Sequence, residues 1–472
     1  MKNLTRRRFV QTAAASALAL SAAGKLSAKT LLDDGQGDGE RSRYRLPKGY
    51  LLVQGLNTYN YSNYGAISTV AEANTFFDQL AGSPEGKLVN GLEYTTLWYN
   101  ANDVQAHATI AQVGLARKID LWQSHVTPST MPAFGPMPPE YQSSYMKPNG
   151  QIVPTTGPIF DILNPEAMDW FLPLYQSVFM EPMKGLISGY FFDEDNLEYV
   201  YPYPANNVRY PYWLNATYSP RVLSLWQAYC GEHDVTYNDQ LVESFPVHDP
   251  AMVANGGGLT AYYPGYNVPA VVQPGQAFVS LPRAEGVWKH WFDFTCELFL
   301  KNWIGRLAKL ANDVNRNESI WKGVLYFQLH PWGLPYEEIK NPDFRLDSIQ
   351  YWAAWGRQRG VDLVKLARHP EVDHIVCETY PPVAANLDEF IGEWSRITLE
   401  AHKTFGVMLD RDDSEMLNMA EEQKRWALIH KYQPTVITRY PVQRMMTSDP
   451  LYNPQVEAYI AQQLLEYRQR ED

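Results

Sequence analysis

Short apolar or aromatic runs alternate with longer helical patterns along the chain from Tyr50 onward. The short runs have the length of strands and predict eight of them, at Tyr50–Thr58, Tyr94–Tyr99, Ile119–Ser124, Leu186–Asp193, Gly323–Gln328, His374–Glu378, Phe405–Asp410 and Thr435–Tyr440. The segments between them repeat apolar residues at helical spacing and predict helices, at Ile67–Ala81, Val104–Arg117, Pro165–Phe179, Trp288–Asn315, Ser348–His369, Leu387–Lys403 and Ala420–Tyr432.

Strands that alternate with helices imply parallel pairing and right-handed crossovers, which places the chain in the α/β class. Eight such units are what a (β/α)8 TIM barrel needs. A doubly wound open sheet is the alternative, but no GxGxxG motif follows the first predicted strand. We therefore predict a (β/α)8 barrel over residues 47–472.

The chain is longer than the roughly 250 residues of a barrel core, so the surplus must lie in loops. The main insertion follows the fourth strand at about residues 199–285, is rich in Tyr, Pro and Gly, and contains a predicted helix near Arg221–Tyr229. A second long loop, Val126–Phe160, follows the third strand. Both loops leave C-terminal strand ends, the face on which the active sites of such barrels lie.

The N-terminus has the pattern of a signal peptide over residues 1–28. A basic segment precedes an apolar Ala- and Leu-rich stretch from Thr12 to Ala23, which is too short to span a membrane. A disordered basic tail is the alternative interpretation. Arg6 and Arg7 stand in a basic run that leads into Phe and Val, which resembles the twin-arginine export signal.

The polar, Gly-rich stretch that follows predicts a linker over residues 29–46. We expect a periplasmic or secreted protein, exported by the twin-arginine route, with no membrane association once the signal is cleaved. No later run is long and apolar enough to span a bilayer.

The composition excludes several classes of function. The chain is 45% hydrophobic and 19% charged, which is typical of a folded protein, and its formal charge is −12, which argues against a nucleic-acid partner. Its 14 Trp and 31 Tyr indicate either a large aromatic core or a groove that stacks sugars. The three Cys and ten His show no metal-ligand spacing, so we expect no metal and no cofactor.

Acidic residues stand at the ends of three predicted strands: Asp193 and Glu194, which are followed by Asn196; Glu378; and Asp410 with Asp412. In a barrel these strand ends face one mouth. Glycoside hydrolysis needs such an arrangement, because one carboxylic acid protonates the leaving oxygen while a second carboxylate acts as nucleophile or base. Helix capping, cation binding or pairing with Arg are the alternative roles for such acids.

Aromatic and polar residues follow two of the same strands. His330 and Trp332 follow the fifth strand, and Tyr380 follows the sixth in a Tyr-Pro-Pro turn. They predict a rim that binds sugars by stacking and hydrogen bonds, although a buried histidine and a plain turn are the alternatives.

Four motifs occur in an order that resembles clan A glycoside hydrolases, in particular the bacterial barrel-type β-galactosidases. They are FDILNPEAMDWF, GYFFDEDNLEY, YSPRVLSLWQAYCGEH and VDHIVCETYPP. The resemblance implies that Glu194 is the general acid/base. Asp193 stands where the related enzymes have Asn, and the seventh strand offers Asp410 and Asp412 where they carry a nucleophilic Glu.

The second catalytic carboxylate is therefore an aspartate of the seventh strand, Glu378, or Asp193. The resemblance implies an exported glycoside hydrolase that acts on an oligo- or polysaccharide. The alternative is a non-catalytic carbohydrate-binding protein on a degenerate barrel. A Ser hydrolase is disfavoured because the chain has no GxSxG motif.

Overall fold

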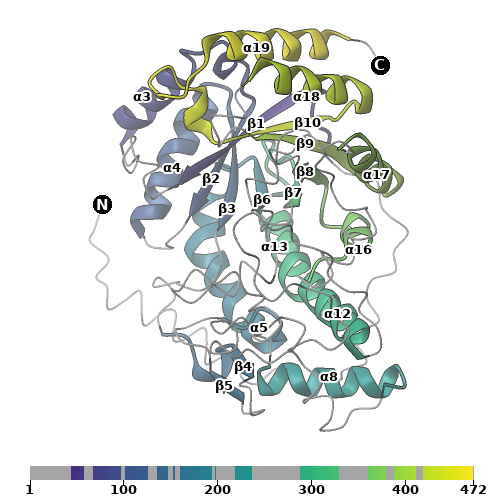
Figure 1. Ribbon diagram of the computed structural model, residues 1–472. Helices are drawn as coiled ribbons and strands as arrows, with labels where there is room; N and C mark the ends of the chain where they lie inside the picture. Colours follow the sequence, from purple (N-terminus) through teal and green to yellow (C-terminus); the bar gives the residue numbers. More distant parts are fainter. Residues whose placement is uncertain are drawn as a thin grey trace, which may run out of the picture.

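The computed structural model describes residues 44–57, 67, 69–96, 101–125, 136–146, 152–154, 160–193, 197, 218–235, 287–328, 360–378, 387–410 and 418–470. Figure 1 shows a barrel of strands with two C-terminal helices, α18 (Met419–Tyr432) and α19 (Pro454–Gln469), on one side. On the opposite side lie α5 (Pro165–Tyr175), α8 (Pro220–Glu232) and the pair of β4 (Ser144–Met146) and β5 (Ile152–Pro154). None of the helices in this part of the chain combines the length and apolar character that a membrane crossing requires.

Eight parallel strands close into a barrel in the order β1-β10-β9-β8-β7-β6-β3-β2. Each strand pairs with its neighbours along the chain, and the last pairs with the first, so the predicted (β/α)8 TIM barrel is confirmed. The strands are β1 (Tyr50–Asn57), β2 (Gly91–Thr96), β3 (Asp120–His125), β6 (Gly189–Asp193), β7 (Val324–Gln328), β8 (His374–Glu378), β9 (Thr404–Asp410) and β10 (Val436–Tyr440).

Helices alternate with these strands. They are α3 (Val70–Leu80), α4 (Ala101–Ala116), α5 (Pro165–Tyr175) with α6 (Glu181–Met183), α12 (Val287–Leu298), α13 (Arg306–Asn315), α16 (Leu363–Ala367), α17 (Leu387–Glu400), α18 (Met419–Tyr432) and α19 (Pro454–Gln469). Six of the seven predicted helical segments coincide with these helices. The seventh prediction, Ser348–His369, is described only from residue 360, where it contains α16.

Helix α19 was not predicted, although the sequence signals it. The Asn453 side chain caps the first turn by accepting from the Gln455 and Val456 amides, and Pro454 occupies the first helical position. Its buried residues, which include Ile460 and Leu464, recur at helical spacing. This helix follows the last strand and completes the eighth strand–helix unit.

The barrel interior is filled by one group of side chains, which we call the interior cluster. Its buried members are Leu46, Tyr50, Leu52, Trp122, Phe191, Leu325, Phe327, Val376, Met408 and Val436, and Tyr440 packs against them. Residues in between, such as Leu51, belong to a separate core between strands and helices. The alternation follows from the two-residue period of a strand.

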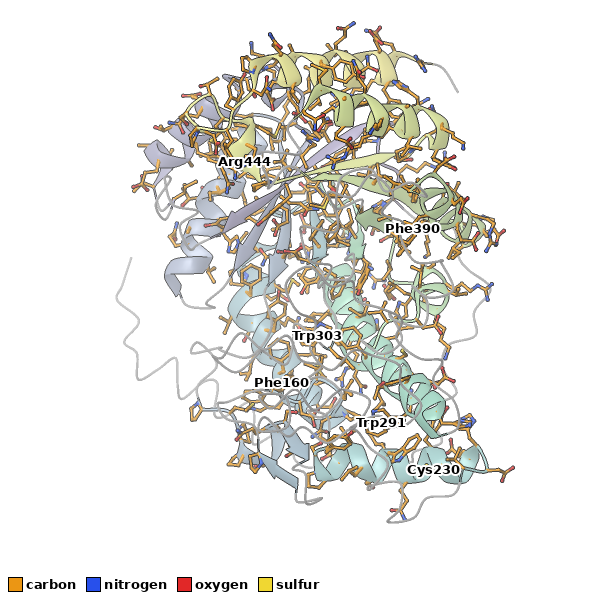
Figure 2. The ribbon with its side chains drawn as sticks, in the orientation of Figure 1. Phe160, Cys230, Trp291, Trp303, Phe390 and Arg444 are labelled. Atoms are coloured by element: carbon orange, nitrogen blue, oxygen red, sulfur yellow. The ribbon has the colours of Figure 1, made fainter. Side chains whose placement is uncertain are left out.

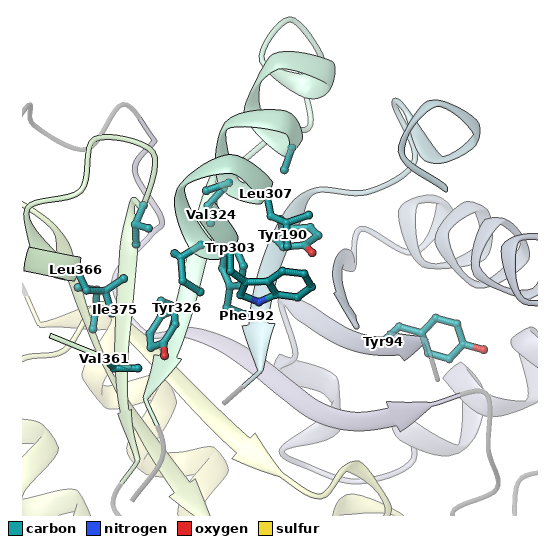
Figure 3. Packing of buried hydrophobic residues seen from close by; sticks show 14 of the residues in the cluster. Tyr94, Tyr190, Phe192, Trp303, Leu307, Val324, Tyr326, Val361, Leu366 and Ile375 are labelled. Carbon is teal, nitrogen blue, oxygen red and sulfur yellow. The ribbon is translucent and has the colours of Figure 1, made fainter. Parts of the chain in front are cut away.

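The core outside the barrel joins the strands to the surrounding helices. Figure 3 shows Trp303 and Leu307 of the helix before β7 close to Tyr190 and Phe192 of β6. All four side chains are buried, so the tryptophan contributes packing rather than a ligand surface.

The N-terminal end of the barrel is closed by Trp122. Its indole Nε1 donates a hydrogen bond of 2.9 Å to the Tyr50 hydroxyl, which donates one of 2.6 Å to Asp120. Burial, aided by the nearby Asp120 carboxylate, raises the pKa of Tyr50 well above its usual range. The hydroxyl therefore remains a donor, and this polar triad fixes the base of the barrel.

One helical run extends well past the strand ends. Helices α12 and α13 are joined without interruption through a π-helical segment, η6 (Phe299–Gly305), and α13 leads into the start of β7. At about 1.5 Å per residue the run is about 40 Å long, whereas a five-residue strand spans about 17 Å. Its α12 end therefore lies beyond the side on which the strands end, as Figure 1 shows.

Further structure packs on this extension. Helix α8 (Pro220–Glu232) lies within the predicted insertion at 199–285, and the antiparallel pair β4 (Ser144–Met146) and β5 (Ile152–Pro154) lies in the segment predicted as a long loop. Trp226 of α8 packs edge-on against Trp291 of α12, with ring centroids 5.2 Å apart. Figure 2 shows Trp291 near Cys230 of α8, at the end of the molecule away from α18 and α19.

Candidate active site

The three strand-end acids lie at the C-terminal edge of one closed parallel sheet. Asp193 is the last residue of β6, Glu378 of β8 and Asp410 of β9. Since all eight strands run parallel, their C-terminal ends form a single rim. The barrel thus brings together three backbone positions that lie far apart in the sequence.

These positions continue the inward face of their strands. Each stands two residues beyond a member of the interior cluster, namely Asp193 beyond Phe191, Glu378 beyond Val376 and Asp410 beyond Met408. The two-residue period of a strand makes all three interior-face positions. The Asp193 side chain is half-buried at this rim; the side chains of Glu378 and Asp410 lie outside the described part of the structure.

Strand register places two of the acids at the same height along the barrel axis, which we call their level. Asp193 pairs with Phe327, and Phe327 pairs with Val376. Strands of a (β/α)8 barrel are staggered by about one residue per strand, because a shear of about 8 is spread over eight strands. Glu378, two residues beyond Val376 and two strands from Asp193, therefore lies at the level of Asp193.

The same register adds an aromatic residue that the sequence did not single out. Glu378 pairs with Met408 and Met408 pairs with Thr438, so Tyr440 reaches the level of Glu378. Its ring packs against the interior cluster and is partly exposed. Tyr440 ends the eighth strand of the barrel. The two-residue period of the strand, counted from Thr438, could have identified it from the sequence as an inward-facing aromatic residue.

A fourth carboxylate lies deeper in the barrel. Glu93 of β2 is 1% exposed and stands between Leu92 and Tyr94, which both face the outer core. Its carboxylate accepts hydrogen bonds from the Gly55 amide, at 2.9 Å, and from the Ser124 hydroxyl. A charged residue between Leu92 and Tyr94 in a strand was the available signal for this site.

The remaining predicted site residues lie outside the described part of the structure: Glu194, Asn196, His330, Trp332, Tyr380 and Asp412. Within the described residues no group of three or more His, Cys, Asp or Glu is arranged to hold a metal ion.

Part of the aromatic content serves packing. The largest fully buried side chains include Trp122, Trp226, Trp291, Trp303, Trp394 and Trp426. These six are therefore unavailable to a ligand, and any stacking surface must come from other aromatic residues, of which Tyr440 is one.

No protein-family model and no curated protein sequence matches this chain. The structure is similar to the endo-1,4-β-mannanase of Rhizomucor miehei, with a TM-score of 0.33, 10% identity and coverage of 91% of this chain and 100% of that one. It is also similar to the endo-1,4-β-D-mannanase of Thermotoga petrophila RKU-1, with a TM-score of 0.29, 11% identity and coverage of 88% and 99%. Both are distant similarities to glycoside hydrolases.

Proposed function

We propose that the protein is an exported glycoside hydrolase that cleaves an oligo- or polysaccharide with carboxylates at the C-terminal mouth of its barrel. The observation that carries this proposal is the position of Asp193 and Glu378, level with each other on the interior face of alternate strands. A pair of acids on one rim is the arrangement that acid-assisted cleavage of a glycosidic bond requires.

In this proposal Glu194 protonates the leaving oxygen, as the resemblance to barrel-type β-galactosidases implies. The second carboxylate is Glu378, Asp193 or Asp410. Crowding several acids at one mouth separates their pKa values, so that one can stay protonated while another is ionised.

The other residues bind the sugar. Asn196 and Asp412 supply hydrogen bonds to hydroxyls, and His330, Trp332 and Tyr380 form the rim, joined by Tyr440. An aromatic face suits the apolar face of a sugar ring and leaves the hydroxyls free for polar partners.

The decisive experiment replaces each acid separately and assays a natural glycan beside an aryl glycoside. Glu194→Gln should lower turnover of the glycan by about 10²–10⁴-fold, through loss of general acid catalysis. The loss should be smaller for an aryl leaving group, which needs less protonation. Glu378→Gln, Asp193→Asn and Asp410→Asn identify the second carboxylate by the largest loss on both substrates.

Asp388→Asn is the matched control, because this half-exposed acid of α17 pairs with Lys431 on the outside of the barrel. It should keep wild-type turnover. Near-normal activity of Glu194→Gln, together with loss in Glu378→Gln or Asp410→Asn, would show that Glu194 is not the acid.

A non-catalytic carbohydrate-binding protein is the second candidate, because β9 ends in Asp410 where the related enzymes carry Glu. A panel of neutral glycans and aryl glycosides separates the two. Binding without turnover by the wild-type protein would favour this candidate. For an active enzyme, the anomeric configuration of the first product shows whether the mechanism is retaining or inverting. Retention corresponds to catalytic carboxyl groups about 5–5.5 Å apart, and inversion to a separation of about 6.5–9.5 Å.

A further inference from the structure

The carboxylate of Glu93 joins three neighbouring strands below the proposed site. It belongs to β2, accepts from the Gly55 amide of β1 at 2.9 Å, and accepts from the Ser124 hydroxyl of β3. At 1% exposure it lies out of reach of bulk solvent. A buried polar group held by such bonds costs much to disturb, because each lost partner leaves a desolvated group behind.

Gly55 lies where β1 departs from regular pairing. The register between β1 and β2 shifts between Val53 and Leu56. Gly55 lies within this stretch and has φ +90°, a backbone conformation that residues other than glycine rarely adopt. The Glu93 carboxylate accepts the Gly55 amide within this irregular stretch. The side chain of one strand therefore fixes the backbone of the next.

The ring of Tyr440 rests on this same glycine. A Cβ added at Gly55 would be 3.0 Å from Cε2 of Tyr440 and 3.3 Å from Cβ of Pro441. The Gly55 backbone is thus in close contact with the ring, and a displacement of Gly55 must move the ring or open a gap beneath it. Tyr440 lies at the level of Glu378, as the strand register shows.

We infer that Glu93 is a positioning residue that sets the place of the Tyr440 ring in the proposed sugar site. It acts through Gly55, whose amide it holds and whose backbone supports the ring. This inference rests on the proposed function for its kinetic consequence, and on the geometry alone for its structural consequence.

The side-chain chemistry gives the inference a specific signature. Glu93→Gln can keep both contacts, since its amide oxygen accepts from Gly55 and its amide NH2 donates to the Ser124 hydroxyl. Glu93→Leu is apolar and one atom shorter, so it keeps neither contact. A positioning role therefore predicts rescue by Gln and loss with Leu, whereas a direct role of the charge predicts loss with both.

The first test measures kcat and KM on a neutral oligosaccharide. Glu93→Leu should raise KM by about 10-fold to 100-fold, in the range that misplacement of a binding group costs, and Glu93→Gln should stay within about twofold. Equal losses in the two variants would overturn the inference. So would an unchanged KM in a folded Glu93→Leu.

The second test is a double-mutant cycle with Tyr440→Ala. If Glu93 acts through Tyr440, Glu93→Leu should raise KM little further once the ring is gone. Additive effects would show that Glu93 acts by another route. Asp120→Asn is the matched control, because this acid accepts from Tyr50 at the opposite end of the barrel; it should lower Tm and leave KM unchanged.

A third measurement needs no activity. Hydrogen exchange of the Gly55 amide should accelerate in Glu93→Leu and not in Glu93→Gln, and a crystal structure of Glu93→Leu should show the Tyr440 ring displaced. Unchanged exchange and an unmoved ring would overturn the inference. A wild-type protein that neither binds nor cleaves any glycan would contradict the proposed function instead, with this measurement still able to decide the role of Glu93.

Discussion

Gly189 lies so close to the indole of Trp122 that a Cβ added at position 189 would be 2.3 Å from Cε3 of the ring. The two residues pair across β3 and β6 near the start of the barrel. Glycine is needed here for space, because the indole occupies the volume that any larger side chain would take.

Gly189→Ala should therefore lower the free energy of unfolding by about 1–3 kcal/mol, the usual cost of overpacking a core. Urea denaturation followed by far-UV circular dichroism measures it. Gly231→Ala is the control, since a Cβ there meets nothing within 4 Å. In this helical position Ala should be neutral or stabilising by up to about 1 kcal/mol. An equal loss in both variants would rule out the packing explanation.

Arg439 should be far more important for stability than an exposed basic residue. Its guanidinium is 1% exposed, with Nε 2.9 Å from Glu85 and Nη1 3.7 Å from Glu422, both fully buried. Arg439→Met takes the cation away from two buried carboxylates and should cost about 3–5 kcal/mol. Thermal and urea unfolding measure the loss.

Lys431→Met is the control for this variant, because its 2.6 Å pair with Asp388 is about half exposed on both sides. Exposed pairs contribute about 0–1 kcal/mol. If Arg439→Met were no more destabilising than Lys431→Met, the buried ion pairs would be irrelevant to stability.

Stability should fall as the pH drops from 6.5 towards 4. Burial lowers the pKa of His374 from 6.5 to about 4, and it lowers that of His369 similarly. The unfolded chain therefore takes up protons at a pH at which the folded protein does not. The stabilising contribution is complete above pH 6.5 and is lost on the way to pH 4, by up to about 3 kcal/mol for the fully buried His374.

The measurement is the free energy of unfolding at several pH values in wild type and His374→Gln. The variant should show a shallower slope between pH 6.5 and 4. His402→Asn is the control, since His402 is exposed at φ 59°, a conformation that Asn tolerates. It should leave the slope unchanged, and an unchanged slope in His374→Gln would exclude His374 as the source.

Export should depend on the paired arginines. Changing Arg6 and Arg7 together to Lys keeps the positive charge and removes the twin-arginine pair, so precursor should accumulate in the cytoplasm. Fractionation with immunoblotting measures the distribution. Changing Lys2 and Lys25 to Arg is the control and should leave export intact. Normal export of the double Lys variant would exclude this route.

The aromatic rim should contribute to substrate binding. Trp332→Ala and Tyr380→Ala should each raise KM on an oligosaccharide by about tenfold, which corresponds to about 1.4 kcal/mol. Tyr459→Ala, on α19 at the outside of the barrel, should leave KM unchanged. Comparable increases in all three would point to a general loss of stability rather than of sugar contacts.

The sequence predicts the barrel because each strand is a short apolar run and the order of elements determines their pairing. Strand β8 has the predicted bounds, His374–Glu378. The starts of β2 and β6 differ from prediction, at Gly91 and Gly189 rather than at Tyr94 and Leu186. Reading Gly91 as a breaker makes the predicted β2 too short, whereas the predicted β6 includes Gly189 and starts too early. Both glycines are strand residues that make room for Trp122.

The candidate site is predictable in part for the same reason. Strand-end acids of a parallel barrel must share one rim, so Asp193, Glu378 and Asp410 follow from the order of elements alone. Glu93 does not, because its role depends on the shifted register of β1 at Gly55. No periodicity in the sequence reveals such a shift.

The filled base of the barrel also determines from which side a ligand can reach the strand ends. From Tyr50 and Trp122 up to Phe327 and Met408 the interior is occupied by side chains, which leaves no passage from one end to the other. A long polymer cannot thread along the barrel axis and, in the proposed enzyme, would have to lie across the strand ends. In the proposed enzyme, substrate would therefore bind and products would leave on the same, C-terminal side of the barrel.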